Sequence, residues 1–189
     1  RDRRQRQMCI RDRLLVLGCI FFVSCKSPEA RKPVQQSSGS FIKESAKRNK
    51  VLYKKEEARI ASIMEANPEH DYLSSDRGFW YYYNVKDSLD VPTPDFGDVV
   101  TFTYNIQSLE GEPILTESET GLQTYKIDQS NQDLISGLRD GVKLMKVGEQ
   151  VTFLFPSYKA YGYYGLEDKL GTNVPVRSTV TLKSIQQSQ

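Results

Sequence analysis

The sequence predicts an α+β domain, in which a curved antiparallel β-sheet wraps around one short α-helix, with a charged helical segment in front of it. Short segments of alternating apolar side chains, separated by turns and breaks at Gly and Pro, predict the sheet. Between residue 133 and Gly148, spacings of three and four predict the helix, whose apolar face carries Leu134, Ile135, Leu138, Val142 and Met145. Gly148 then predicts the helix end.

The length and charge of the chain limit the classes of function. A chain of 189 residues allows one domain with appendages. The formal net charge is +2, but residues 1–24 hold six arginines and two aspartates, which leaves 20 basic and 22 acidic side chains elsewhere. This balance gives no electrostatic footprint for nucleic acid, so we expect no nucleic-acid partner.

The first 24 residues are predicted to be a leader. Residues 14–23 form an apolar run that is too short to span a bilayer and fits a secretory signal. Residues 22–25 then resemble a bacterial lipobox, which predicts lipidation of Cys25; Cys19 is a second candidate, and an ordinary cleaved signal without lipid is the alternative. Residues 1–13 look like translated adapter sequence rather than a native terminus.

Cysteine usage agrees with export. All three cysteines lie in the first 25 residues, so maturation at Cys25 leaves none for a disulfide or a metal cluster. Two or more acyl chains would anchor the chain stably to a membrane. The expected location is therefore the cell envelope, with the protein lipid-anchored to a bacterial membrane and facing the periplasm.

Two segments separate this anchor from the domain at residues 76–189. Residues 25–40, rich in Ser and Pro, predict a lipidated cysteine followed by a flexible tether. Residues 41–75 form a charged segment, helical over 41–66, with sparse apolar positions. That helix is expected to dock weakly on the domain or to pair two copies as a weak homodimer. Glutamates interrupt its lysines, which argues against nucleic-acid or membrane-surface binding.

The strands of the domain follow in order. Residues 78–83 predict an aromatic strand, whose Trp80 either fills a core or forms a stacking platform; core filling is the stronger interpretation. Residues 98–106 alternate with one apolar face, Glu110 and Gly111 mark a hairpin turn, and further strands are expected at 123–127, 151–155 and 178–185.

A tyrosine-rich loop follows the strand that ends at Pro156. Val151, Phe153 and Phe155 alternate along that strand. The loop after it carries Tyr158, Tyr161, Tyr163 and Tyr164 between glycines. Helix, strand and loop together predict an apolar pocket with aromatic walls.

These motifs resemble the FKBP family of peptidyl-prolyl cis-trans isomerases over residues 78–185. The resemblance includes the G-D-x-V-x-x-x-Y strand at 97–104, the E-G turn, Y-K-I at 125–127, A-Y-G at 160–162 and the R-S-T entry to the last strand. Residues 26–34, the serine-rich tether and the two tyrosine-rich stretches are more narrowly similar to the gliding-motility-associated FKBP-type lipoproteins.

The resemblance implies a site and its roles. Tyr161, Tyr125 and Leu138 are the expected catalytic residues, and the expected substrate-binding residues are Tyr104, Ile114, Leu134, Ile135 and Leu182. In two places the chain departs from the family pattern. Leu138 replaces a tryptophan, while Ile114 and Leu115 replace a phenylalanine and an aspartate. Loss of the carboxylate argues against tight binding of macrolide inhibitors.

The expected chemistry is rotation about an X-Pro peptide bond, whose barrier is about 18–20 kcal/mol. The twisted transition state is less polar than the planar amide, so a dry aromatic cleft favours it. Tyr161 is expected to donate its hydroxyl to the carbonyl before proline; alternatively, that hydroxyl bonds a neighbouring loop carbonyl. Tyr104 is either a pocket wall or core packing. No proton moves, so no cofactor and no metal are expected.

The function implied is that of a lipid-anchored folding factor that isomerises X-Pro bonds in proline-containing polypeptides among exported proteins, with gliding-motility machinery among the clients. A second hypothesis is a non-catalytic FKBP-like binding or chaperone module in a cell-envelope complex. Leu115 is the residue that favours this second hypothesis.

Overall fold

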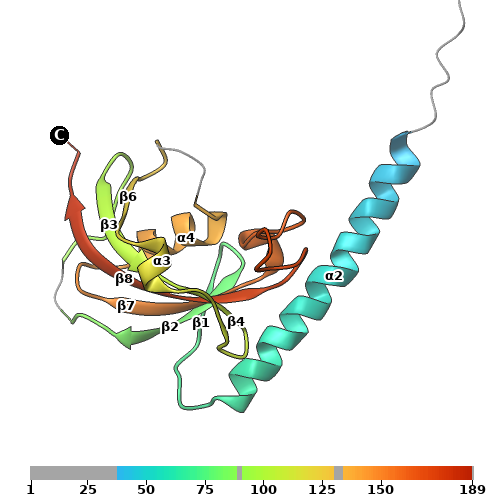
Figure 1. The fold of residues 1–189 in the computed structure, drawn as a ribbon, viewed down its shortest axis with the longest axis horizontal. Helices are drawn as coiled ribbons and strands as arrows, with labels where there is room; N and C mark the ends of the chain where they lie inside the picture. The colour runs from blue at the N-terminus through green and yellow to red at the C-terminus, as the bar shows by residue number, and fades with distance from the viewer. Residues whose placement is uncertain (1–37, 89–90, 130–133, 189) are drawn as a thin grey trace, which may run out of the picture. The chain divides into compact units, whose positions relative to one another are not determined.

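The computed structural model describes residues 38–88, 91–129 and 134–188, with side chains from residue 41 (Figure 1). An antiparallel sheet with strand order β1-β2-β7-β8-β3-β6 curves around helix α4, and β4 and β5 form a hairpin beside β8. The strands are β1 (Leu73–Ser75), β2 (Phe79–Val85), β3 (Val99–Tyr104), β4 (Ile106–Ser108), β5 (Pro113–Leu115), β6 (Gln123–Lys126), β7 (Gln150–Phe155) and β8 (Val176–Gln186). The predicted α+β fold is confirmed.

The short helix is smaller than its apolar pattern suggests. Helix α4 spans Ser136–Gly141 and continues as the 3-10 helix η1, Val142–Leu144. Leu134 and Ile135 therefore precede the helix, and Gly148 lies in a later turn with φ of 87°. The apolar face is nevertheless buried as the spacing predicts, because Leu138, Val142 and Met145 are at most 1% exposed.

Two glycines let α4 lie close against β7. A Cβ atom on Gly137 would come within 2.6 Å of the Phe155 ring, and one on Gly141 within 2.9 Å of the Phe153 ring. Cβ atoms in proteins essentially never come this close to another side chain, so α4 can pack this closely on β7 only with glycine at both positions.

The segment predicted as one strand at 98–106 is divided at Asn105 into β3 and β4. The side-chain oxygen of Asn105 accepts the Thr179 backbone N–H at 2.9 Å, and its carbonyl accepts the Ser178 hydroxyl at 2.6 Å. The apolar face continues across this break, since Val100, Phe102 and Ile106 are fully buried. These bonds to β8 therefore fix the point where the chain turns into the β4–β5 hairpin.

Strand β2 has apolar side chains on both faces. Phe79 is buried beside Phe153 and Phe155 in the main core, whereas Trp80 points to the other face and packs with Leu154. Trp80 and Leu154 are direct partners in the β2–β7 register. Trp80 thus fills a second, smaller core, in line with the core-filling interpretation.

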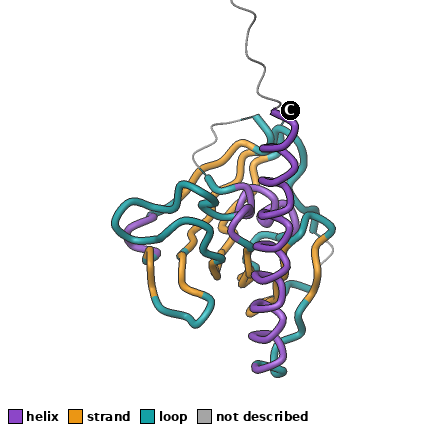
Figure 2. Tube along the Cα trace, turned by 90° about the vertical axis from the view of Figure 1, so that its right-hand side faces the viewer, coloured by secondary structure: helices purple, strands orange, loops and turns teal. Residues whose placement is uncertain are grey.

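Helix α2 (Ser38–Ala66) covers this second core; it begins at Ser38, inside the stretch predicted as tether. Ile60 is fully buried against Leu109 and Leu154, with Ile63 and Met64 packed beside them. Figure 2 shows the helix in front of the strands. The N-terminal part of α2 is mostly exposed, including Ile42 and Val51. Docking of α2 on the domain is therefore observed, while its strength and the homodimer stay predictions.

Two further elements complete the fold. The sequence did not predict edge strand β1 or the single-turn helix α3 (Glu117–Thr120), which Thr116 and Glu119 cap reciprocally. No helix in the described ranges has the length and apolar character needed to cross a bilayer. The predicted leader, Cys25 and most of the tether lie outside the described residues.

Candidate functional site

The eight predicted site residues all belong to one apolar cluster on the concave side of the sheet. Tyr125, Leu138 and Leu182 are buried members of this cluster, with at most 3% of each side chain exposed. The other five are half-buried and pack against it: Tyr104, Ile114, Leu134, Ile135 and Tyr161. The fold thus gathers residues separated by up to 78 positions, Tyr104 to Leu182, in one place.

Adjacent strands and α4 provide the base of this cluster. Tyr125 on β6 pairs with Val100 on β3, and Leu182 on β8 pairs with Phe102 on the same strand. Leu138 belongs to α4 and lies between Gly137 and Gly141, the two glycines that allow α4 to pack closely on β7. Three neighbouring elements therefore hold these side chains in a dry environment.

The phenol of Tyr125 is oriented by the turn that follows β6. Its hydroxyl oxygen accepts the backbone N–H of Asp128 at 3.2 Å. Asp128 has φ of 56°, and its carboxylate pairs with Lys143 of η1 at 2.5 Å. The turn thus fixes the polar end of Tyr125 while the ring stays in the core.

Tyr161 brings a hydroxyl to the edge of this cluster. Burial, and secondarily the nearby Tyr104 phenol, raise the pKa of Tyr161 to about 12, so the hydroxyl stays protonated at neutral pH. Within the described part of the chain, no group hydrogen-bonds this hydroxyl. The loop carbonyl that would serve the alternative interpretation is not observed there.

The backbone around Tyr161 is tightly bonded. The 3-10 helix η2 (Ser157–Lys159) precedes it, and the Ser157 carbonyl accepts the N–H groups of Ala160 at 3.0 Å and Gly162 at 2.9 Å. The Gly162 carbonyl then accepts the Asn173 N–H at 2.7 Å. Tyr161 therefore sits between two residues that are anchored to the same carbonyl.

Tyr104 fits both interpretations offered for it. Its ring lies 6.1 Å from Phe102 in the core, and burial raises its pKa. It is also close enough to Tyr161 to raise the pKa of that phenol. Tyr104 thus packs on the core and forms the side of the cluster that faces Tyr161.

Leu115 is the residue that the sequence resemblance aligns with a family aspartate. It pairs with Ile106 across the β4–β5 hairpin and packs, half-buried, against the main cluster. Leu170 and Ala160 pack against the same cluster and were missed from the sequence. Leu170 belongs to an irregular loop that no periodicity marks, where it forms an isolated bridge with Leu166.

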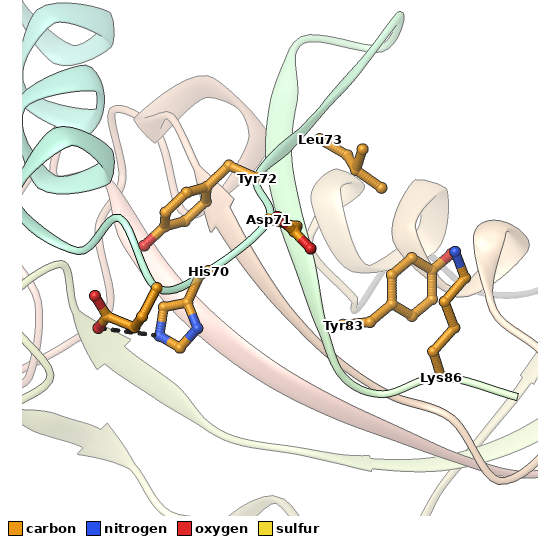
Figure 3. Close-up of a pocket in the computed structure, with 7 residues that line it drawn as sticks. His70, Asp71, Tyr72, Leu73, Tyr83 and Lys86 are labelled. Atoms are coloured by element: carbon orange, nitrogen blue, oxygen red, sulfur yellow. Dashed lines mark ion pairs between the residues drawn. The ribbon is translucent and has the colours of Figure 1, made fainter.

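A separate hollow of about 770 Å³ lies near the end of β2 (Figure 3). It is lined by Glu69, His70, Asp71, Tyr72, Leu73, Tyr83 and Lys86, and so contains none of the predicted site residues. His70 stacks on the Tyr82 ring at 4.0 Å and lies 3.7 Å from Glu69. These contacts give the single histidine a packing role at this position.

The cluster can therefore offer an apolar surface and a protonated phenol. Among the described residues, no group of His, Cys, Asp and Glu side chains suits a metal ion. An apolar wall with the Tyr161 hydroxyl at its edge suits binding of a proline ring and its preceding carbonyl. This chemistry needs neither proton transfer nor covalent attack.

Comparison with known proteins agrees with the geometry. Residues 91–183 match the model of the FKBP-type peptidyl-prolyl cis-trans isomerase family. The probable FKBP-type peptidyl-prolyl cis-trans isomerase FkpA of Neisseria meningitidis serogroup B is 34% identical over 95 residues, which are 50% of this chain and 33% of that protein. The match thus spans about a third of the length of that curated relative.

Two solved structures share the fold. A peptidyl-prolyl cis-trans isomerase from Pseudomonas syringae pv. tomato has a TM-score of 0.57 at 22% identity, covering 73% of this chain and 96% of its own. FkpA from Escherichia coli has a TM-score of 0.56 at 18% identity, covering 95% of this chain and 83% of its own. These two structures show the shared fold alone, and the family match identifies residues 91–183 as a domain of the FKBP-type peptidyl-prolyl cis-trans isomerase family.

Proposed function

We propose that this domain catalyses cis-trans isomerisation of X-Pro peptide bonds in polypeptide clients. The observation that carries the proposal is the Tyr161 phenol, which is protonated and has no hydrogen-bond partner among the described residues, at the edge of the apolar cluster. Family membership supports the same reaction. Uncatalysed isomerisation takes tens of seconds or longer and limits folding, so an enzyme that accelerates it speeds the folding of its clients.

The proposed mechanism is differential binding of the twisted amide. Tyr125, Leu138 and Leu182 enclose the pyrrolidine ring, and Tyr161 donates its hydroxyl to the carbonyl before proline. As the C–N bond rotates, the amide loses conjugation and becomes less polar, so a dry wall favours it over the planar ground state. Each 1.36 kcal/mol of this preference gives a tenfold rate gain.

The test of the donor role is Tyr161→Phe, which removes only the hydroxyl. We expect kcat/KM for a proline-containing peptide to fall about tenfold, as for loss of one hydrogen bond to the reacting group. The matched control is Tyr72→Phe, since burial also raises the pKa of that tyrosine but it lies beside the separate hollow. Unchanged activity in Tyr161→Phe rejects the donor role.

The cellular setting is a second part of the proposal. The apolar run at 14–23 and the residues before Cys25 support a lipid-anchored folding factor in the cell envelope, acting on exported proteins and, by resemblance, on gliding-motility machinery. Labelling with a fatty-acid analogue should mark the wild type and Cys19→Ser but not Cys25→Ser. Label retained in Cys25→Ser would show that the lipid is attached to a different residue.

A non-catalytic binding or chaperone module is the alternative function, favoured by Leu115 in place of a carboxylate. A proline-limited refolding assay separates the two functions. Faster refolding at catalytic concentrations supports the isomerase, whereas binding of the unfolded client without acceleration supports the module. The proposed weak homodimer through residues 41–66 is tested independently by sedimentation, where a monomer at every concentration would refute it.

A further inference from the structure

Helix α2 contributes a buried carboxylate to the segment that carries Tyr161. Glu56 is only 5% exposed, although its neighbours on the helix are exposed. Its Oε2 accepts the Ser157 backbone N–H at 2.8 Å, and its Oε1 accepts the Ser157 hydroxyl at 2.7 Å. A buried carboxylate is costly unless it is hydrogen-bonded, and here a single residue supplies two bonds.

Ser157 connects this carboxylate to the backbone on both sides of Tyr161. It is the first residue of η2, and its own carbonyl accepts the N–H groups of Ala160 and Gly162. The loop also contains Gly162 and Gly165 with φ of 55° and 66°, conformations that glycine adopts readily. A loop of this kind needs external contacts to hold one arrangement, and Glu56 bonds a residue at its start.

A second contact of α2 lies one helical turn before Glu56. The Tyr53 ring is 4.8 Å from the ring of Tyr158, the residue after Ser157. The Tyr158 hydroxyl in turn donates to the Gly78 carbonyl at 3.0 Å. Tyr53, Glu56 and Ile60 are spaced by three and four, so they share the helix face that meets the domain.

We propose that Glu56 is a positioning residue of the isomerase site, which holds Tyr161 in place through Ser157. The proposal rests on the isomerase function proposed above. Removal of the carboxylate leaves the Ser157 N–H and hydroxyl without their acceptor and loosens both backbone bonds next to Tyr161. A small displacement of a catalytic group costs rate even when substrate binding is preserved.

The experiment compares Glu56→Ala and Glu56→Gln with Glu65→Ala, a glutamate exposed on the same helix. Full-length variants are assayed for kcat and KM on a proline peptide, and the Tyr161 phenol is titrated by difference against Tyr161→Phe. We expect Glu56→Ala to lower kcat about tenfold with little change in KM. The pKa of Tyr161 should fall from about 12 towards 10 as the ring becomes more exposed. Glu56→Gln keeps an acceptor for the Ser157 N–H and should recover part of both effects, and Glu65→Ala should behave as wild type.

A purely adhesive role for Glu56 predicts a different result: lower stability, with kcat and the Tyr161 titration unchanged in the folded variant. That result overturns the proposal. If Glu56→Ala does not fold, Glu56→Gln and Ser157→Ala are judged by the same two readouts. A wild type without isomerase activity would refute the proposed function, whereas the titration still decides whether Glu56 positions Tyr161.

Discussion

The two faces of the sheet are held to their helices by different interactions. On the concave face, α4 packs on a large apolar cluster that contains Phe102, Phe153 and Leu182. On the other face Ile60, Leu109 and Leu154 form a smaller buried apolar cluster, and α2 adds polar contacts from the glutamate that bonds Ser157. The first interface is the core of the domain. The second is an attachment that can transmit position without carrying most of the stability.

Substitutions at two neighbouring residues of β7 test this difference in stability between the two faces. Phe153 faces the concave cluster and Leu154 faces α2, and each is at most 1% exposed. We expect Phe153→Ala to lower the free energy of unfolding by about 4 kcal/mol and Leu154→Ala by about 2 kcal/mol, because α2 can shift to fill the smaller cavity. Urea unfolding of both variants checks this. An equal or larger loss for Leu154→Ala would contradict the comparison.

The next prediction concerns the close packing of α4 on β7. An added methyl at Gly137 would collide with the Phe155 ring and with the Lys159 carbonyl, 2.9 Å away. Gly137→Ala should therefore lower the free energy of unfolding by about 2 kcal/mol through overpacking. Gly171→Ala is the control, because its methyl would meet Val174 at an ordinary 3.8 Å. A melting temperature as low for Gly171→Ala as for Gly137→Ala would show that the effect is general to glycine replacement.

The concave face was largely predictable because its signals are local. Alternation marks Phe153 and Phe155, and helical spacing marks Leu138, so the cluster follows once the strands pair. The bounds of α4 were less predictable, since Leu134 and Ile135 continue its apolar pattern before the helix begins. Periodicity reports which side chains are buried, not where the backbone becomes helical.

Docking of α2 was expected, but the polar contacts that attach it could not be predicted in the same way. Glu56 and Ser157 are 101 positions apart, and a glutamate in a lysine-rich helix has the pattern of a solvated residue. The break at Asn105 was equally hidden, because it depends on side-chain bonds to β8 rather than on the apolar pattern. Polar contacts between distant segments leave no period in a sequence.

Alkaline pH should weaken the concave side in a smaller, graded way. Burial raises the pKa values of Tyr161 and Tyr83 to about 12, above the ordinary value of 10. In the unfolded chain these phenols ionise first, so stability is intact below pH 10 and falls as pH rises from about 10 to 12. Urea midpoints at pH 8 and pH 11 measure the loss, and Tyr161→Phe should reduce it. An identical loss in that variant would assign the effect to other groups.

The smallest effect is expected for an exposed ion pair of the α2 interface. Arg59 bonds Glu110 at 2.6 Å, but both side chains are more than half exposed, so solvent screens the pair. Arg59→Gln should cost about 0.5 kcal/mol or less in unfolding free energy, and the cost should vanish at high salt. Glu56→Gln, one helical turn away, should cost more at every salt concentration because its bonds to Ser157 are buried. Equal costs for the two variants would mean that burial of Glu56 adds nothing to the attachment, and the contrast between the faces would then rest on apolar area alone.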